Sequence, residues 1–150
     1  MRFPDTEGEN LAGQELAFPR DFGVRTIALV AFDLKARDDL ESWVPFIDRF
    51  ARAGRINGRV FPVLSGSMIK MKGVILAAIR KTTPAAPEVR AATVPLFVDI
   101  DAFCAALGIS DRTAIHILVI EPDGAVLEHR TGPYSQPVAA LIETHVEATA

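Results

Sequence analysis

The feature that most constrains the fold is an uninterrupted apolar run, TIALVAF, at residues 26–32. A strand with one face in water alternates apolar and polar residues, whereas a run without alternation predicts a strand covered on both faces. The chain must therefore place a layer of structure on each side of a sheet. Residues 114–120 give the strongest strand pattern in the chain.

Helical periodicity follows the first strand. Apolar residues recur at helical spacing from residue 40 to residue 50, so we expect a helix that begins at Asp38 and Asp39 and ends near Gly54. The two aspartates are expected to cap this helix, where their charge suits its positive end. Pro45 falls inside the helix and should kink it, because proline lacks the N–H and clashes with the preceding turn.

The remaining patterns complete the element order. Pro62, within a strand expected at residues 59–64, suggests an edge or a bulge. A helix from Ser65 or Ser67 to about residue 81 carries an apolar stripe expected to face the core: Met68, Met71, Ile75 and Ile79, broadened by Ile69, Val74 and Leu76. The other expected elements are a short edge strand and turn within 11–22, an extended segment at 93–98, a helix at 101–107, a hairpin over 114–130 and a last helix at 136–147.

This order predicts the fold class. Parallel strands joined by crossover helices and closed by an antiparallel hairpin form an α/β sandwich, with a central mixed sheet, a C-terminal β-hairpin and flanking helices. The chain of 150 residues is expected to be a single domain, residues 1–150. Residues 1–10 are polar, and we expect them to be poorly ordered.

Composition excludes several classes of protein. One cysteine, Cys104, excludes an internal disulfide framework and a cysteine-rich zinc site. The first residues lack the apolar core of a signal peptide, and no apolar run is long enough to span a membrane. We therefore expect a cytoplasmic protein.

Charge is distributed unevenly. Residues 49–87 contain no Asp or Glu. This block either faces the acidic remainder of its own fold or a second subunit, as in a homodimer, or it forms an anion-binding surface. Nucleic acid is a poor fit, because the chain has one Tyr and one Trp for stacking and a net charge of −3. The candidate anion surface consists of Arg49, Arg52, Arg55, Arg59, Lys70, Lys72, Arg80 and Lys81.

The spacing of Phe32 and Pro45 resembles the thioredoxin pattern, in which Phe, four residues, Cys-x-x-Cys, four residues and Pro follow one another. The two cysteine positions fall here on Arg37 and Leu40. The resemblance therefore implies a thioredoxin-like fold, while disulfide exchange needs thiols that these two residues do not supply. The segment 94–109, inserted before the last hairpin, looks more like the peroxiredoxin branch of this superfamily.

Other parts of a redox site are also missing. Residues 33–36 do not offer the Pro-x-x-x-(Thr/Ser)-x-x-Cys motif of a peroxiredoxin. The cis-proline of thioredoxins would fall near Ile115 or His116, and neither is proline.

A narrower resemblance rests on Phe32, on SWVPF at residues 42–46 and on LGI at residues 107–109. These residues look like the thioredoxin-like family that includes the mitochondrial ATP-synthase assembly factor. That resemblance implies a protein that binds an assembly subunit and performs no thiol chemistry.

Few side chains are candidates for chemistry. Cys104 lies in an apolar segment, which suppresses thiol reactivity, so we expect a buried structural residue. His116 and His129 lie on the two arms of the hairpin: a tight Asp123-Gly124 turn would place them on one face, and a three-residue turn would place them on opposite faces. We predict no metal, because a third ligand is not evident.

The sequence favours a redox-inactive thioredoxin-fold protein that serves as a binding or assembly module for a protein partner. It predicts no catalytic residue and no cofactor. One alternative is a peroxiredoxin-like or other thiol-dependent enzyme that uses Cys104 or a non-standard site. Another is an anion-binding domain that uses residues 49–81. The candidate partner surface consists of Arg37, Asp38, Asp39, Leu40 and Trp43, of which Trp43 fits either a core anchor or a contact residue.

Overall fold

The computed structural model describes residues 1–54 and 56–147, so Arg55 of the basic block lies outside the described residues. Its main sheet has the order β5-β4-β3-β6-β7. Strands β4 and β5 run parallel to β3. On the other side of β3, β6 pairs antiparallel with β3, and β7 pairs antiparallel with β6. The expected mixed sheet with a terminal hairpin is confirmed. The strands are β3 (Thr26–Ala31), β4 (Asn57–Ser65), β5 (Leu96–Val98), β6 (His116–Ile120) and β7 (Val126–Thr131).

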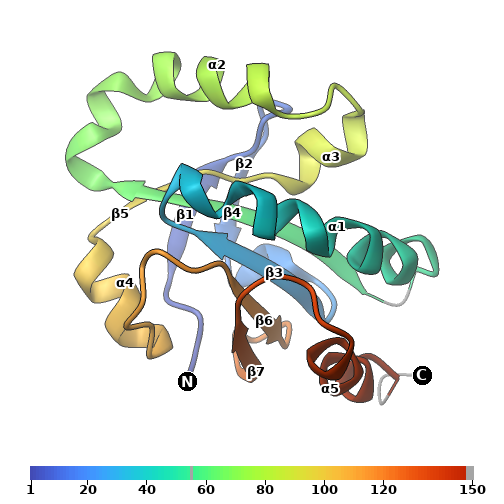
Figure 1. The fold of residues 1–150 in the computed structure, drawn as a ribbon. Helices are drawn as coiled ribbons and strands as arrows, with labels where there is room; N and C mark the ends of the chain where they lie inside the picture. The colour runs from blue at the N-terminus through green and yellow to red at the C-terminus, as the bar shows by residue number, and fades with distance from the viewer. Residues whose placement is uncertain (55, 148–150) are drawn as a thin grey trace.

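Both faces of β3 are covered, as its apolar run predicts (Figure 1). Ile27 and Leu29 pack with α1 (Arg37–Arg52) and α5 (Gln136–Glu147). Ala28 and Val30 pack on the other face, against α4 (Ile100–Leu107) and a small hairpin of β1 (Thr6–Glu9) and β2 (Glu15–Phe18). The sandwich therefore has two apolar cores, one on each side of the sheet.

The connection between β4 and β5 carries the peripheral elements. It contains η3 (Gly66–Met71), α2 (Lys72–Thr82) and α3 (Pro87–Ala92). Figure 1 shows α2 at the outside of the molecule, on the β4 and β5 side of the sheet. Two further 3₁₀ segments, η1 (Arg20–Phe22) and η2 (Leu34–Ala36), precede β3 and α1.

The start of α1 differs from the expected cap. The helix begins at Arg37, and its N-cap residue is Ala36, which makes no side-chain capping bond. Asp38 and Asp39 lie in the first helical turn, where their carboxylates still face the positive end of the helix dipole. Pro45 lies inside α1, as the sequence predicts.

The suggestion that Pro62 marks an edge or a bulge is wrong. Strand β4 lies between β5 and β3, and its register with β3 runs without a shift to Pro62. Pro62 pairs with Ala31, the last residue of β3, and pairing with β5 begins at Val63. On that side of β4 an isolated bridge also joins Val60 to Thr93, so Pro62 falls between this bridge and the β5 ladder, and an interior strand tolerates the missing N–H there.

The first residues are integrated into the fold, where the sequence led us to expect a poorly ordered end. Phe3 is 2% exposed and packs edge-on against Phe22 and Phe103 at centroid distances of 5.2 and 5.6 Å. Its amide donates to the carbonyl of Gly124 at 2.7 Å. Phe3 therefore fills the core from a segment that is otherwise polar.

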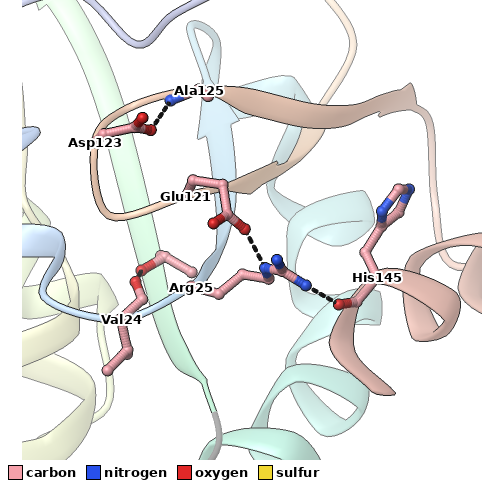
Figure 2. A network of polar contacts seen from close by, with 7 residues as sticks. Val24, Arg25, Glu121, Asp123, Ala125 and His145 are labelled. Atoms are coloured by element: carbon pink, nitrogen blue, oxygen red, sulfur yellow. Dashed lines mark hydrogen bonds and ion pairs between the residues drawn. The ribbon is translucent and has the colours of Figure 1, made fainter. Parts of the chain in front are cut away.

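A polar network joins the ends of three elements (Figure 2). Arg25, the residue before β3, donates from its guanidinium to the carboxylate of Glu121 and to the carbonyl of His145 in α5. Asp123 accepts the amide of Ala125 at 2.9 Å and shapes the hairpin turn. The network holds α5 and the hairpin against the start of β3.

Candidate functional site

Three chain segments meet beyond the end of β3. Five residues, 32–36, separate the end of β3 from helix α1, which begins at Arg37. Because β6 is antiparallel to β3, its first residue, His116, pairs with Val30 near that same end. The amide of Gly132 donates to the carbonyl of Ile115 at 3.0 Å, which brings in the segment after β7. The α1 start, the residue before β6 and the segment 132–135 therefore lie at the same end of the sheet.

Trp43 supports these segments from below. It is fully buried, and its Nε1–H donates to the carbonyl of Gly132 at 2.9 Å. Its ring packs edge-on against Tyr134 at 5.1 Å and Phe46 at 5.6 Å. Of the two interpretations of Trp43, burial favours the core anchor, while the exposed aromatic at this place is Tyr134.

The other residues of the candidate partner surface lie on the first turn of α1. Arg37 and Asp38 are exposed, whereas Asp39 and Leu40 are half-buried. Arg37 donates to Glu41 at 3.1 Å and to the carbonyl of Thr82, the last residue of α2, at 2.8 Å. The candidate partner surface and the helix of the basic block therefore adjoin.

Ser42 links the α1 start to Tyr134. Its hydroxyl accepts the Tyr134 amide at 2.9 Å and donates to the Asp39 carbonyl at 2.5 Å. This pair of bonds fixes Tyr134 over Trp43 with 44% of the tyrosine exposed. We name the combination of Arg37, Asp38, Leu40 and Tyr134 the α1-start surface. Sequence reasoning missed Tyr134, because it lies 97 positions after Arg37 and no local pattern connects the two.

The hairpin brings His116 and His129 together on one face. The turn itself has three residues, since Glu121 and Ala125 are bonded across it and Ile120 pairs with Val126. If that register continued along the hairpin, His129 would lie opposite Ile117, on the other face from His116. A bulge between Val119 and Ile120 shifts the register by one, so His129 lies opposite Leu118. The turn therefore has three residues, yet His116 and His129 lie on one face, as we expected for the tight turn.

The two imidazoles form a directed hydrogen-bond chain. His116 is buried, and its Nε2 lies 2.5 Å from the carbonyl of Asp111. A carbonyl can only accept, so this nitrogen carries a proton, and Nδ1 of His116, when it carries none, accepts from Nε2–H of His129 at 2.8 Å. Burial, followed by the nearby His116 and Arg130, lowers the pKa of His129 from its ordinary value.

Cys104 is buried in the core. It lies in α4, is 3% exposed and belongs to the core that also holds Phe103 and Leu107. Its burial is the one expected of a structural residue.

Much of the basic block is engaged within the fold. Arg49 pairs with Glu143 at 2.8 Å, and Lys72 pairs with Glu9 at 3.3 Å. Arg59 and Arg80 donate to backbone carbonyls, those of Ala91 and Leu11. Arg52, Lys70 and Lys81 are exposed. The block therefore faces its own fold in part, and the candidate anion surface is reduced to scattered positions.

In the part of the chain that the structure describes, no group of three or more His, Cys, Asp or Glu side chains could hold a metal ion. A groove of about 440 Å³ runs between α1, β4 and α3, and Asp48, Arg52 and Glu88 bring both signs of charge to it. It lies beside the helices, away from the α1-start surface. No helix within residues 1–54 or 56–147 has both the length and the apolar character that crossing a bilayer requires.

The fold is shared with a large group of solved structures. Among them, yeast Sco1 aligns with a TM-score of 0.64 at 14% identity, covering 98% of this chain and 95% of that one. Copper-bound ScoI of Arabidopsis thaliana aligns with a TM-score of 0.61 at 10% identity, over 98% and 97% of the two chains. A putative thiol:disulfide interchange protein, DsbE of Chlorobium tepidum, aligns at 0.59 and 13% identity, over 99% and 94%.

These alignments define the class: the chain has a thioredoxin-like fold. Its structural neighbours include Sco proteins and thiol:disulfide interchange proteins. No protein-family model matches the sequence. No curated protein matches it either. At identities of 10–15% the neighbours establish the fold alone, and the peroxiredoxin branch and the assembly-factor family remain predictions.

Proposed function

We propose that this protein is a protein-binding or assembly module that does not carry out thiol–disulfide exchange. The proposal rests on the identity of the residues at the start of α1. Arg37 and Leu40 stand where the thioredoxin pattern has its two cysteines, on the first turn of the helix after β3. Disulfide exchange requires a thiolate that attacks and a second thiol that resolves the intermediate, and this surface supplies neither.

The α1-start surface has features that suit protein recognition. Tyr134 presents part of its ring to solvent while Trp43 and Phe46 hold it from beneath. Tyrosine and arginine are enriched among the residues that dominate binding energies, and a rigidly held aromatic loses little entropy on binding. Arg37 and Asp38 add charges of both signs at the rim. A cytoplasmic location is part of this proposal, since a single buried thiol suits a reducing compartment.

A disulfide-exchange assay tests the absence of redox chemistry. The protein should not catalyse insulin reduction by dithiothreitol, and Cys104→Ser should behave in the same way. The variant with both Arg37→Cys and Leu40→Cys should gain measurable turnover, because it restores two thiols at the helix N-terminus, where thiolates are stabilised. Turnover by the unmodified protein that Cys104→Ser abolishes would overturn the proposal in favour of the thiol enzyme.

Site-specific photocrosslinking in cells of the source organism tests the binding surface. A photoreactive residue in place of Tyr134 should give a discrete protein adduct, and Arg37→Glu should weaken that adduct about tenfold or more, because it reverses a rim charge. The matched control carries the photoreactive residue in place of Leu141, an exposed position on α5. Equal adducts at both positions, or none at Tyr134, would contradict a partner at the α1-start surface.

A further inference from the structure

The segment η3–α2 exposes apolar side chains that the sequence assigns to a core. Met68, Ile69, Met71 and Val74 are 39%, 50%, 55% and 67% exposed. Leu76 is the only buried residue of α2. The prediction that this stripe faces the core is therefore wrong for its first half, and we name Met68, Ile69, Lys70, Met71, Val74 and Lys81 the η3–α2 face.

The outward side of α2 is itself apolar. Val74, Ala77, Ala78 and Lys81 are all exposed, and their spacing of three and four residues places them on one side of the helix. The opposite side holds Leu76 against the body. A helix that is apolar on both sides is normally covered on both. Something outside the chain is therefore expected to cover the outward side.

The charged residues of this face itself are basic. No Asp or Glu occurs between residues 49 and 87. Lys72 is paired with Glu9, which balances its charge, whereas Arg80 donates to a neutral backbone carbonyl and keeps its positive charge. Lys70 and Lys81 remain exposed beside the apolar side chains. The occupant must therefore accept apolar side chains and carry negative charge.

We propose that the η3–α2 face docks onto an anionic lipid bilayer surface. Aliphatic and thioether side chains interleaved with lysines suit such an interface, because the apolar groups enter the acyl boundary while the lysine stems reach up to the phosphates. This docking goes beyond the protein-binding function proposed above and uses different residues.

Charge and composition disfavour the other occupants. In a homodimer through this face, Lys70 and Lys81 of one copy would approach the same lysines of the other, and like charges in contact repel. A protein partner usually meets an interface that contains aromatic or arginine anchors and charges of both signs. The η3–α2 face has neither feature.

Vesicle co-sedimentation tests the proposal with the full chain. The protein should bind vesicles of phosphatidylcholine that contain about a quarter phosphatidylglycerol at least tenfold more strongly than vesicles of phosphatidylcholine alone, since each exposed lysine adds attraction to an anionic surface. Raising the salt concentration should reduce the difference, because screening shortens the range of the attraction.

Two paired variants locate the docking surface. Lys70→Glu with Lys81→Glu should abolish the preference for anionic vesicles, and Ile69→Ser with Met71→Ser should weaken binding at least tenfold. Lys35→Glu and Leu141→Ser, at exposed positions elsewhere, are the matched controls and should bind as the unmodified chain does. Circular dichroism checks that each variant is folded.

Three outcomes would overturn the proposal. The first is no binding to anionic vesicles, and the second is binding that the control variants weaken as much as the face variants do. The third is a dimer in analytical ultracentrifugation that Ile69→Ser with Met71→Ser dissociates, which would show that a second copy covers the face. None of these depends on the photocrosslink at Tyr134, so each proposal fails separately.

Discussion

At the scale of single residues, Trp43 decides how the α1-start surface is built. Its ring is fully buried, and its one polar atom is used by the carbonyl of Gly132. A tryptophan on the helix after the first core strand therefore works by holding another residue, Tyr134, at the surface. Tyr134, which is exposed, and Trp43, which holds it, are far apart in the sequence.

Trp43→Phe should lower the free energy of unfolding by about 1–3 kcal/mol, because it removes a buried hydrogen bond and leaves a small cavity. Urea denaturation followed by circular dichroism measures the change. Tyr134→Phe keeps the ring and is the control, with an expected change within about 0.5 kcal/mol. Equal losses in the two variants would contradict the supporting role of Trp43.

The pKa of His129 predicts how stability depends on pH. Burial, followed by the nearby His116 and Arg130, holds this pKa below its ordinary value of 6.5, so the folded state favours neutral His129. The unfolded chain then binds more protons in the window below pH 6.5, and stability falls as the pH falls through that window toward the lowered pKa.

Unfolding free energies measured between about pH 8 and pH 5 should decline toward the acid side, in the direction that proton linkage requires. His129→Gln should flatten this decline, because glutamine keeps a polar side chain and does not titrate. A decline of the same steepness in His129→Gln would show that other groups cause it.

At the scale of elements, α1 lies close to β4 because of a glycine. A Cβ atom on Gly58 would lie 2.4 Å from Cγ2 of Ile47 in α1, which is far inside van der Waals contact. The absence of a side chain at this position therefore sets the height of α1 above the sheet, and with it the position of the α1-start surface.

Gly58→Ala should destabilise the protein by about 1–3 kcal/mol through overpacking. Ile47→Ala in the same chain should relieve the clash, so the two changes together should cost less than their sum. Gly73→Ala, in α2 with open space around it, is the control and should stabilise by about 0.5–1 kcal/mol. Denaturant midpoints with a constant slope give these values, and strictly additive losses would contradict the close approach.

The elements also show where sequence reasoning succeeds. Residues 26–32 predict β3 because full burial leaves an unbroken apolar run, and Gly108 ends α4 in the left-handed conformation that glycine favours. A local sequence pattern is sufficient to predict an element whose type and ends are determined by its own residues. They fail for α2, because periodicity reports which side chains are apolar and says nothing about whether the body reaches both sides of the helix.

At the scale of the whole molecule, the site depends on contacts that no local pattern encodes. Phe3 sits in a polar segment, and Tyr134 precedes the last helix. Each is placed by partners about 90 or more positions away in sequence, Phe103 and Trp43. A single sequence predicts the layers of this sandwich, but it does not predict which residues from distant parts of the chain come into contact.

Phe3→Ala should lower the unfolding free energy by about 3–5 kcal/mol, which is the cost of emptying a buried aromatic site. Val24→Ala, at an exposed position, should change it by less than about 0.5 kcal/mol. Thermal and urea unfolding measure both. A loss below that of a surface substitution would show that the N-terminal segment does not contribute to the core.

The position of Phe3 also bears on biosynthesis. Its partners include Phe103 and the backbone of Gly124, which a ribosome adds long after Phe3 has emerged. The aromatic cluster of Phe3, Phe18 and Phe22 is therefore complete only once Phe103 and the hairpin have been added. Apolar surface exposed on a nascent chain promotes aggregation and recruits chaperones. The protein should thus depend on chaperone protection until its C-terminal hairpin has been made.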